Sequence, residues 1–432
     1  MKPEELYKIY LQYPSIQTDT RKLKTGDLFF ALKGPNFNGN IFAKQALDEG
    51  AGYAVIDERE FEIPGKTILV ADVLTALQQL ANHHRRQFNI PFIAITGSNG
   101  KTTTKELIHA VLSEKYKVYT TEGNLNNHIG IPLTILKIQK DAEIAVIEMG
   151  ANHLHEIESY CKIAAPTHGL ITNCGKAHLE GFGSIEGVRK GKGELFDYLR
   201  ARNDATVFIM KDYDYLQQMS KGISRIVSYG ASDADITGNI ARDSSTLLKV
   251  LVHIQSSAAE IKTNLVGDYN LPNVLAAAAV GNEFNISLDN IRSAIENYQP
   301  SNSRSQLIES GTNKIILDAY NANPSSMKLA IDNFAKVNAA HKILMLGAMA
   351  EMGAETATEH NTLITQIKNY NWDEVVLVGK PFATFSNEFI YFEDSAEAAD
   401  WAQQQSFTNT YLLIKGSRSS RMEKIVTAIV NR

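Results

Sequence analysis

The stretch Phe92-Ile93-Ala94-Ile95-Thr96-Gly97-Ser98-Asn99-Gly100-Lys101-Thr102 decides the fold of this 432-residue chain. Its apolar beginning is short and bounded by turn residues, as in a buried parallel strand, and helical periodicity follows over residues 103–115. A glycine-rich loop in this position lets backbone amides and a helix N-terminus bind phosphate oxygens, while the lysine adds a charge and the threonine can hold Mg²⁺. The stretch therefore predicts a site for nucleotide phosphates, formed by Gly97, Ser98, Asn99, Gly100, Lys101, Thr102 and Thr103.

The loop departs from the usual phosphate-binding pattern at one position. Ile95 stands where the first glycine normally lies, and Gly97 follows two residues later. A coincidental turn would explain the glycines, but not a Gly-Lys-Thr-Thr sequence directly after a strand.

Strands and helices alternate downstream of the loop, which predicts a parallel sheet. Strands are expected at residues 117–121, 144–147, 169–172 and 206–210, and short alternating runs between 223 and 265 suggest an antiparallel extension. The central sheet should therefore be mixed.

Two further α/β units flank the central one. Upstream, strands are predicted at 28–32, 53–56 and 67–70, with helices at 41–49 and 73–88. Downstream, strands at 314–317, 342–346, 374–378 and 410–414 each precede a helical pattern, without a Gly-x-Gly-x-x-Gly sequence. The expected fold is α/β with three domains: a small N-terminal α/β domain at 1–89, a central P-loop mononucleotide-binding sheet at 90–300, and a Rossmann-like C-terminal domain at 301–432.

The composition excludes several classes of protein. With 44% hydrophobic and 21% charged residues, the chain should be globular, and its net charge of −5 argues against a nucleic-acid or anionic-membrane partner. No basic leader and no apolar run long enough for a membrane span is seen, which predicts a cytoplasmic protein without stable membrane association. Cys161 and Cys174 lack the spacing of a disulfide framework or a zinc site.

The loop resembles that of the Mur ligase family, cytoplasmic amide-forming enzymes of peptidoglycan precursor synthesis, and the resemblance extends nearly end to end. Residues 123–132 look like the segment that these enzymes place beside the substrate and the γ-phosphate, which implies substrate contacts for Asn126, Asn127 and His128. Glu148 ends a predicted buried strand, where α/β sheets present metal-binding carboxylates, although a surface glutamate could also stand there.

The same resemblance implies two Mg²⁺ ions. Thr102 and Glu148 would bind the first, and His178 would be a ligand of the second, although a lone histidine is usually structural. Lys192 matches a lysine that reacts with CO₂ in several Mur ligases to give an anionic carbamate ligand; otherwise it belongs to a solvated basic run.

Two segments resemble the family's nucleotide contacts. Residues 265–278 look like its Gly-x-His-Asn-x-x-Asn element, with Tyr269 replacing the histidine, which implies that Asn270 and Asn273 contact adenine. Without the resemblance they would be read as a helix cap and its neighbour. Arg304 resembles an arginine that reaches the nucleotide phosphates, at a hinge that would couple ATP binding to domain closure.

The segment Asp318-Ala319-Tyr320-Asn321-Ala322-Asn323-Pro324-Ser325-Ser326 discriminates best among family members. It is typical of the member that adds D-alanyl-D-alanine, and it implies substrate contacts for Asp318, Tyr320, Asn321, Asn323 and Ser326. Residues 347–353 with His360, and 415–418 with Arg421, are further matches. Thr20 and Arg21 resemble the uridine-nucleotide domain, in which Asn38 and Asn40 replace the common Asp and His around Gly39.

The resemblance implies an ATP-dependent, ADP-forming peptide ligase. It would phosphorylate the terminal carboxylate of UDP-N-acetylmuramoyl-tripeptide, and the amine of D-alanyl-D-alanine would then attack the acyl phosphate. Its partners would be these small molecules, and the chain is expected to be a monomer. Two alternatives stay open: the family member that adds diaminopimelate or lysine to the dipeptide precursor, and a P-loop nucleotide-binding regulator without ligase activity.

Overall fold

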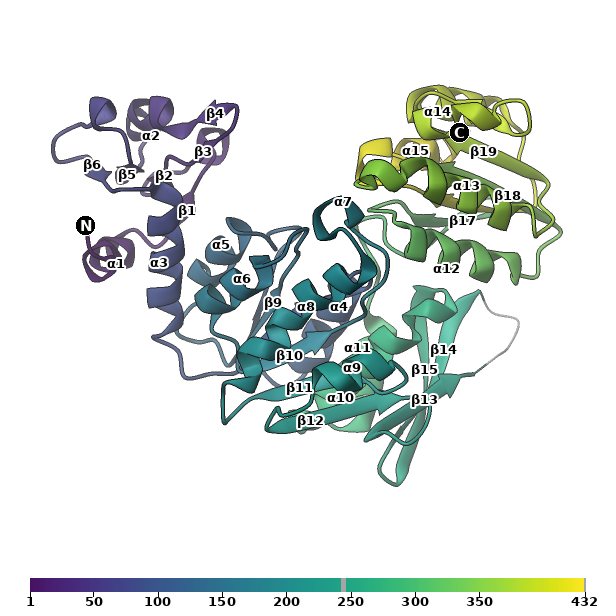
Figure 1. Ribbon diagram of the computed structural model, residues 1–432, viewed down its shortest axis with the longest axis horizontal. Coiled ribbons are helices and arrows are strands. Elements are labelled where there is room, and N and C mark those ends of the chain that lie inside the picture. Colours follow the sequence, from purple (N-terminus) through teal and green to yellow (C-terminus); the bar gives the residue numbers. More distant parts are fainter. Residues whose placement is uncertain (242–245, 431–432) are drawn as a thin grey trace.

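The computed structural model describes residues 1–241 and 246–430, and its three main sheets follow one another along an arched molecule (Figure 1). Residues 242–245, in the predicted central domain, and 431–432, at the end of the predicted C-terminal domain, lie outside the described residues. Helices pack on mostly parallel sheets throughout, so the predicted α/β fold class is confirmed.

The N-terminal unit is built on a small parallel sheet of order β1-β2-β5-β6. Alternate residues of β2 point to opposite faces: Phe29 packs under α2, whereas Leu28 and Phe30 face the side of α3. Its elements are α1 (Pro3–Gln12), β1 (Ile16–Gln17), β2 (Leu28–Phe30), β3 (Lys33–Gly34), β4 (Phe37–Asn38), α2 (Ala43–Asp48), β5 (Tyr53–Ile56), β6 (Thr67–Leu69) and α3 (Val73–Arg85).

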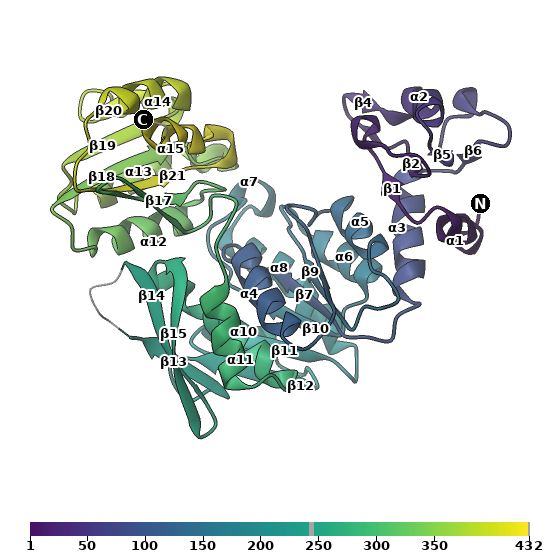
Figure 2. The ribbon, with the colours of Figure 1, turned by 180° about the vertical axis from the view of Figure 1, so that it is seen from behind.

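Helix α3 runs from this small sheet to the central unit (Figures 1 and 2). It packs against α5 (Gly130–Leu136) and α6 (Glu156–Ala164), and its Leu77 and Leu80 belong to the same buried cluster as the central core. At its end the buried Arg85 donates to the carbonyl oxygens of Ala164 and Ala165, at 2.9 Å each, and covers the ring of Phe92. Apolar and charge-assisted contacts thus join the first two units.

Among its described residues, the central unit contains one nine-stranded sheet of order β15-β14-β13-β12-β11-β10-β7-β9-β8. Strand β7 (Phe92–Thr96) is buried along its whole length, as its apolar sequence predicts, and lies between β9 and β10. The remaining elements are α4 (Lys101–Ser113), β8 (Val118–Thr120), β9 (Ile144–Glu148), β10 (His168–Ile171), α7 (Leu179–Phe182), α8 (Ile185–Arg200), β11 (Thr206–Met210), α9 (Asp214–Met219), β12 (Arg225–Gly230), β13 (Ile236–Ile240), β14 (Leu247–Ile254), β15 (Ser257–Val266), α10 (Leu271–Glu283) and α11 (Leu288–Asn297).

The predicted antiparallel extension is partly wrong. Strand β12 pairs parallel with both β11 and β13, and antiparallel pairing begins only between β13 and β14. Alternation of polar and apolar residues shows that a strand is half-buried but does not give its direction, which depends on the connection. The mixed character of the sheet was predicted correctly.

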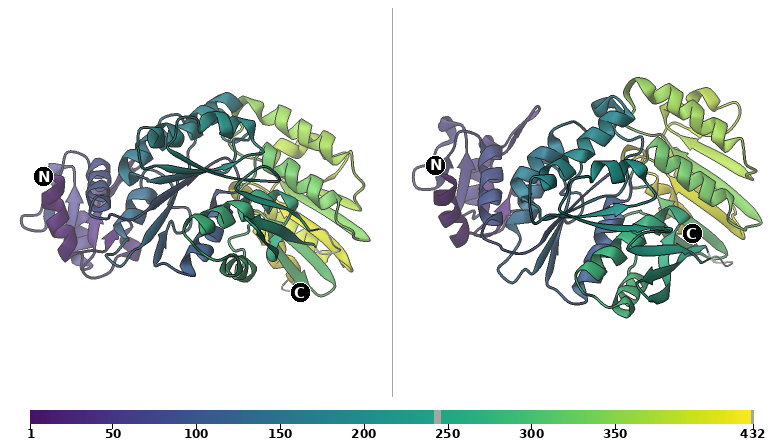
Figure 3. Two further views of the ribbon diagram at one scale, coloured as in Figure 1. Left: turned by 90° about the horizontal axis from the view of Figure 1, so that it is seen from below. Right: turned by 60° about the horizontal axis from the view of Figure 1, so that its bottom comes forward.

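The C-terminal unit is a doubly wound sheet of order β16-β17-β21-β18-β19-β20, parallel except for the edge strand β16. Figure 3 shows this unit, coloured green to yellow, beside the central one. Helices α12 and α13 cover one face, and α14 and α15 cover the other. Its elements are β16 (Gln306–Ser310), β17 (Asn313–Asp318), α12 (Pro324–Ala335), β18 (His341–Gly347), α13 (Thr356–Ile367), β19 (Glu374–Val378), β20 (Ile390–Phe392), α14 (Ser395–Gln404), β21 (Thr410–Lys415) and α15 (Glu423–Val430). Within residues 1–241 and 246–430, no helix is both long and apolar enough to cross a membrane.

Candidate active site

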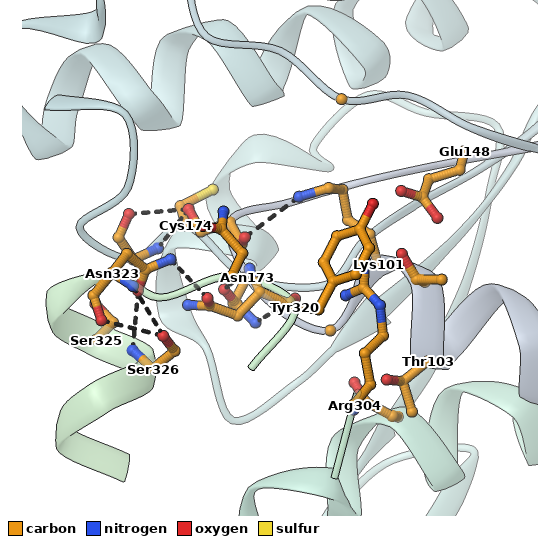
Figure 4. Close-up of a pocket in the computed structure, with 18 of the residues that line it drawn as sticks. Lys101, Thr103, Glu148, Asn173, Cys174, Arg304, Tyr320, Asn323, Ser325 and Ser326 are labelled. Carbon is orange, nitrogen blue, oxygen red and sulfur yellow. Dashed lines mark hydrogen bonds between the residues drawn. The ribbon is translucent and has the colours of Figure 1, made fainter. Parts of the chain in front are cut away.

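A cavity of about 900 Å³ lies between the central and C-terminal units, at the carboxyl ends of β7, β9 and β10. Parallel α/β sheets place ligands at this edge. Figure 4 shows Glu148 and Arg304 on one side of the pocket, and Asn323, Ser325 and Ser326 beside Asn173 and Cys174 on the other. Most of the predicted site residues line it: Ser98, Asn99, Gly100, Lys101, Thr102, Thr103, Asn126, Asn127, His128, Glu148, His178, Asn270, Asn273, Arg304, Asp318, Tyr320, Asn321, Asn323 and Ser326.

The phosphate loop requires its two glycines. Gly97 and Gly100 have φ values of 143° and 80°. A Cβ at Gly97 would lie 2.0 Å from Oγ1 of Thr172, and one at Gly100 would lie 2.6 Å from Oδ1 of Asn273. The loop therefore approaches its neighbours too closely for side chains and leads directly into α4, whose first amides have no acceptor within the helix.

Lys101 folds back over its own loop. Its Nζ donates to the carbonyl oxygens of Gly97 at 2.6 Å and Ser98 at 3.2 Å. Burial lowers the pKa of Lys101, although the carboxylates of Glu148 and Glu351 oppose the shift. This cation lies where phosphate oxygens would need it.

Glu148, at the end of β9, has the environment of a cation ligand. Its Oε1 accepts a hydrogen bond of 2.7 Å from Asn126, whereas its buried Oε2 has no hydrogen-bond partner among the residues that the structure describes. An unpaired buried carboxylate oxygen is costly and points to a missing cation. Thr102 is buried on the same cavity wall. In the described part of the chain, however, no three His, Cys, Asp or Glu side chains gather as a metal site.

His178 is paired with a carboxylate of the C-terminal unit. Its Nδ1 lies 2.5 Å from Oε2 of Glu351, and this close contact is the main cause that lowers the pKa of Glu351. His178 also has the left-handed φ of 52° that non-glycine residues seldom adopt. The structure thus brings the predicted histidine to the cavity but gives it a partner that the sequence interpretation did not assign.

Lys192 lies behind the cavity wall rather than on it. The side chain is fully buried in α8, and its Nζ donates to the carbonyl oxygen of Ala151 at 2.7 Å. Burial, together with the positive charge of Lys101, lowers the pKa of Lys192 to about 7. The interpretation as a solvated basic run is therefore wrong, because this lysine has no access to bulk water.

Asn270 and Asn273 are buried at the start of α10 and are joined by a hydrogen bond of 2.8 Å. Nδ2 of Asn270 also donates to the Val266 carbonyl oxygen, and Oδ1 of Asn273 accepts from Thr104. Neither side chain makes a capping hydrogen bond to this helix. Asn270 thus holds the N-cap position that the capping interpretation predicts, but it makes no capping hydrogen bond, and the pair instead links α10 to the helix that follows the phosphate loop.

Arg304 stacks on Tyr320, with its Cζ 3.5 Å from the ring centroid. Arg418 also lies over this ring, at 5.7 Å. Within the described part of the chain, the buried Nε of Arg304 has no hydrogen-bond partner. Two guanidinium groups therefore meet on the ring of Tyr320, and the one from Arg304 lines the cavity, where it can bind an anion.

The loop from Asp318 to Ser326 faces the phosphate loop across the cavity. Asp318 pairs with the buried Lys415 at 2.5 Å, which holds the start of the loop. Oδ1 of Asn323 caps α12, and its Nδ2 donates to Oδ1 of Asn99 at 2.8 Å. One asparagine thus couples the helix of the C-terminal unit to the phosphate loop.

Four predicted residues lie outside the cavity lining. Gly97 and Lys192 are behind it, whereas Thr20 and Arg21 belong to the N-terminal unit, where Arg21 is exposed and paired with Asp19. In the same unit the buried Asn40 donates to Asp57 at 2.8 Å and accepts from the backbone amide of Asp57 at 3.0 Å. Asn40 is thus part of the framework that shapes this surface.

Several lining residues were not predicted as site residues: Glu156, Cys174, Tyr213, Tyr215, Ser325, Glu351 and Lys415. A signal was available for some of them. Tyr213 and Glu351 follow the predicted strands at 206–210 and 342–346. Residues after strand ends lie at the carboxyl edge of a parallel sheet, where ligands bind. Tyr215 stacks on Tyr213 with ring centroids 5.6 Å apart, a contact that no pattern in the sequence indicates.

Comparisons with known proteins cover almost the whole chain. Residues 12–85, 95–281 and 303–418 match models of the Mur ligase family catalytic domain, the Mur ligase middle domain and the Mur ligase glutamate ligase domain. The UDP-N-acetylmuramoyl-tripeptide–D-alanyl-D-alanine ligase of Escherichia coli (strain K12) is 36% identical over 98% of this chain and 95% of its own length. The ligase of the same name from Bacillus subtilis (strain 168) is 32% identical over 96% and 93%.

Solved structures agree with the sequence relatives. A crystal structure of MurF from Acinetobacter baumannii superposes with a TM-score of 0.88 and 28% identity, covering 100% of this chain and 99% of its own. MurF ligase from Thermotoga maritima in complex with ADP gives a TM-score of 0.87 and 25% identity, with 98% of each chain covered. The predicted resemblance is thus confirmed, and the chain belongs to the Mur ligase family.

Proposed function

We propose that the chain is an ATP-dependent ligase that joins UDP-N-acetylmuramoyl-tripeptide to D-alanyl-D-alanine and releases ADP and phosphate. The observation that carries this proposal is the shared cavity, in which the phosphate loop faces the Asp318–Ser326 loop and Asn99 contacts Asn323. A nucleotide and an amine held on these two walls would meet in one enclosed space. The ligase names of the relatives, at 36% and 32% identity, support the same substrates.

The reaction would proceed in two steps, which use different walls of the cavity. ATP transfers its γ-phosphate to the terminal carboxylate of the tripeptide, and the amine then attacks the acyl carbon and displaces phosphate. Lys101 and the first amides of α4 would stabilise the phosphate charge, and Asn270 and Asn273 would face the adenine. Asn126, Asn127 and His128 would hold the tripeptide end, because they line the wall beside Glu148.

Magnesium fits the Glu148 side of the cavity. Mg²⁺ is commonly held by one or two protein oxygens together with substrate phosphates, and Thr102 with the unpaired Glu148 Oε2 provides such a set. Bound there, the ion would neutralise charge on the transferred phosphoryl group. His178 and a carbamylated Lys192 would belong to a second ion. Their support is the position of His178 on the cavity and the pKa of Lys192 near 7, which keeps part of its amine neutral.

The three predicted domains would divide the substrates. Residues 1–89, with Thr20 and Arg21, would bind the uridine nucleotide; residues 90–300 would bind ATP; and residues 301–432 would hold the incoming amine. The C-terminal assignment rests on Asp318, Tyr320 and Asn321, which line the cavity at the end of β17.

A coupled ADP-release assay tests the function. The enzyme, ATP and Mg²⁺ are mixed with the tripeptide or dipeptide nucleotide precursor and with D-alanyl-D-alanine, meso-diaminopimelate or L-lysine. We expect ADP release only with the tripeptide precursor and D-alanyl-D-alanine. Release with the dipeptide precursor and a diamino acid would instead identify the alternative ligase, and ATP binding without any substrate-dependent release would indicate a regulator.

A further inference from the structure

An incoming amine creates an electrostatic problem at this cavity. Near neutral pH an α-amino group is largely a cation, and Lys101 and Arg304 already give the cavity two positive groups. A carboxylate is therefore needed to bind the ammonium group beside the phosphate site. Five lining residues carry one: Glu148, Glu156, Asp268, Asp318 and Glu351.

Four of these carboxylates already have other positions or partners. Asp318 is neutralised by Lys415 at 2.5 Å, and Glu156 accepts the backbone amides of Asn152 and His153 at the start of α6. Asp268 lies at the adenine end, two residues before Asn270. Glu148 faces the phosphate loop, where its unpaired oxygen suits a metal ion.

Glu351 is the remaining candidate, and it belongs to the C-terminal unit. It follows β18, its side chain is 48% exposed, and its carboxylate reaches across to His178. Only Oε2 makes that 2.5 Å contact, and a carboxylate has further lone pairs on both oxygens. A glutamate carboxylate is an anion at neutral pH. Glu351 also has a left-handed φ of 61°, a costly conformation that functional sites often retain.

The loop that carries Glu351 is fixed to the C-terminal unit. The backbone amide of Met349 donates to Nε2 of the buried His360 at 3.1 Å, and Nδ1 of His360 lies 2.7 Å from the carbonyl oxygen of Thr356. The carbonyl oxygen of Ala348 accepts from Oγ of Ser420 at 3.1 Å. Glu351 therefore moves with the domain that would hold the incoming dipeptide.

We propose that Glu351 binds the ammonium group of the incoming amine and holds its nitrogen beside the acyl phosphate, where the group loses a proton to water before the neutral amine attacks. This inference rests on the proposed ligase function and adds to it a residue for recognition of the amine. Glu351 is a binding and positioning group in this scheme, and no proton transfer is assigned to it.

The test compares two glutamates at the same domain junction. Glu359 also forms an ion pair across this junction, with Lys176 at 2.8 Å. Neither Glu359 nor Lys176 lines the cavity, whereas Glu351 does. Glu351→Gln should raise the KM for D-alanyl-D-alanine about 10- to 100-fold, the effect of one charge-assisted hydrogen bond. The KM values for ATP and the tripeptide should stay unchanged, and Glu359→Gln should leave all three unchanged.

A neutral analogue separates charge recognition from a structural effect. D-lactoyl-D-alanine, with a hydroxyl in place of the ammonium group, should inhibit the wild type and Glu351→Gln equally. Glu351→Asp, which keeps the charge, should regain part of the affinity for the dipeptide.

Two results would overturn the proposal. Equal increases of the KM for D-alanyl-D-alanine in both glutamine variants would show that Glu351 only holds the two domains together. A changed Mg²⁺ requirement with an unchanged KM for the dipeptide would show that it is a metal ligand. If the wild type releases ADP only with another amine, the proposed substrate is wrong, yet the same comparison applies to that amine because it also carries an ammonium group.

Discussion

The two junctions between the units of this chain are built from opposite kinds of contact. At the first, α1 and α3 pack into the core of the central unit, where Tyr10 donates to the Leu136 carbonyl oxygen and Arg85 is buried. At the second, the contacts around the cavity are polar: Asn99 with Asn323, Lys176 with Glu359, and His178 with Glu351.

The difference indicates which junction can move. Separating the first would expose a continuous apolar cluster and leave buried carbonyl groups without donors, which costs several kcal/mol. The polar contacts at the second junction are partly solvated, since Lys176 and Glu351 are each about half exposed, so they exchange with water at a lower cost. Its main apolar link is Val266, which joins the C-terminal core at the end of β15. Substrate entry and domain closure are therefore expected at the second junction, which also encloses the cavity.

The largest expected effect concerns the phosphate loop inside the second junction. Lys101→Ala should lower turnover by at least about 10³-fold, because it removes a cation from the transferred phosphoryl group. The ADP-release assay measures turnover, and an unchanged melting temperature would show that the fold is intact. Near-normal turnover by a folded variant would refute the assignment of the loop.

The next effect tests the rigidity of the first junction. Arg85→Ala should lower the free energy of unfolding by about 2–4 kcal/mol, because the carbonyl oxygens of Phe88, Ala164 and Ala165 lose their buried donor. Urea denaturation measures this change. Arg86→Ala is the control, since Arg86 is exposed and its loss should change stability by less than about 0.5 kcal/mol. Equal losses in both variants would contradict a special role for the buried arginine.

The smallest effect concerns the polar contacts of the second junction. Lys176→Ala removes the cation that pairs with the buried Glu359 and should lower the free energy of unfolding by about 1–2 kcal/mol, a moderate loss because Lys176 itself is half-exposed. The nucleotide-free protein should nevertheless open more readily, seen as a larger radius of gyration in X-ray scattering. High salt should expand the wild type in the same direction, because it screens this pair. An unchanged radius in both experiments would mean that other contacts hold the units together.

Much of this architecture could be predicted because the relevant signals are local. The apolar run at 92–95 and the helical pattern after Thr103 determine β7, the loop and α4, and the strands at 53–56, 206–210 and 374–378 have the predicted limits. The edge strands β16 and β20 were missed. Short edge strands depend on pairing with a neighbour, which periodicity within one segment does not reveal.

The site residues could be assigned to strand ends, but their partners could not. Asn99 and Asn323 are 224 residues apart, and the contact between His178 and Glu351 depends on how two units dock. The full burial of Lys192 could not be predicted either, because its charged neighbours Arg189 and Lys190 are typical of a solvent-exposed segment. These are tertiary contacts, so the periodicity within one segment of the sequence does not reveal them.

The two cysteines provide native probes for the two junctions. Cys161 is buried in α6, the helix that meets α3, and Cys174 lies in the loop beside the phosphate loop. Burial raises the pKa of both thiols, to about 12 for Cys174, so neither reacts readily with an alkylating reagent in the closed fold. Without any engineered label, the rate of thiol modification should therefore report opening at each junction separately, and the cysteine beside the cavity should react first.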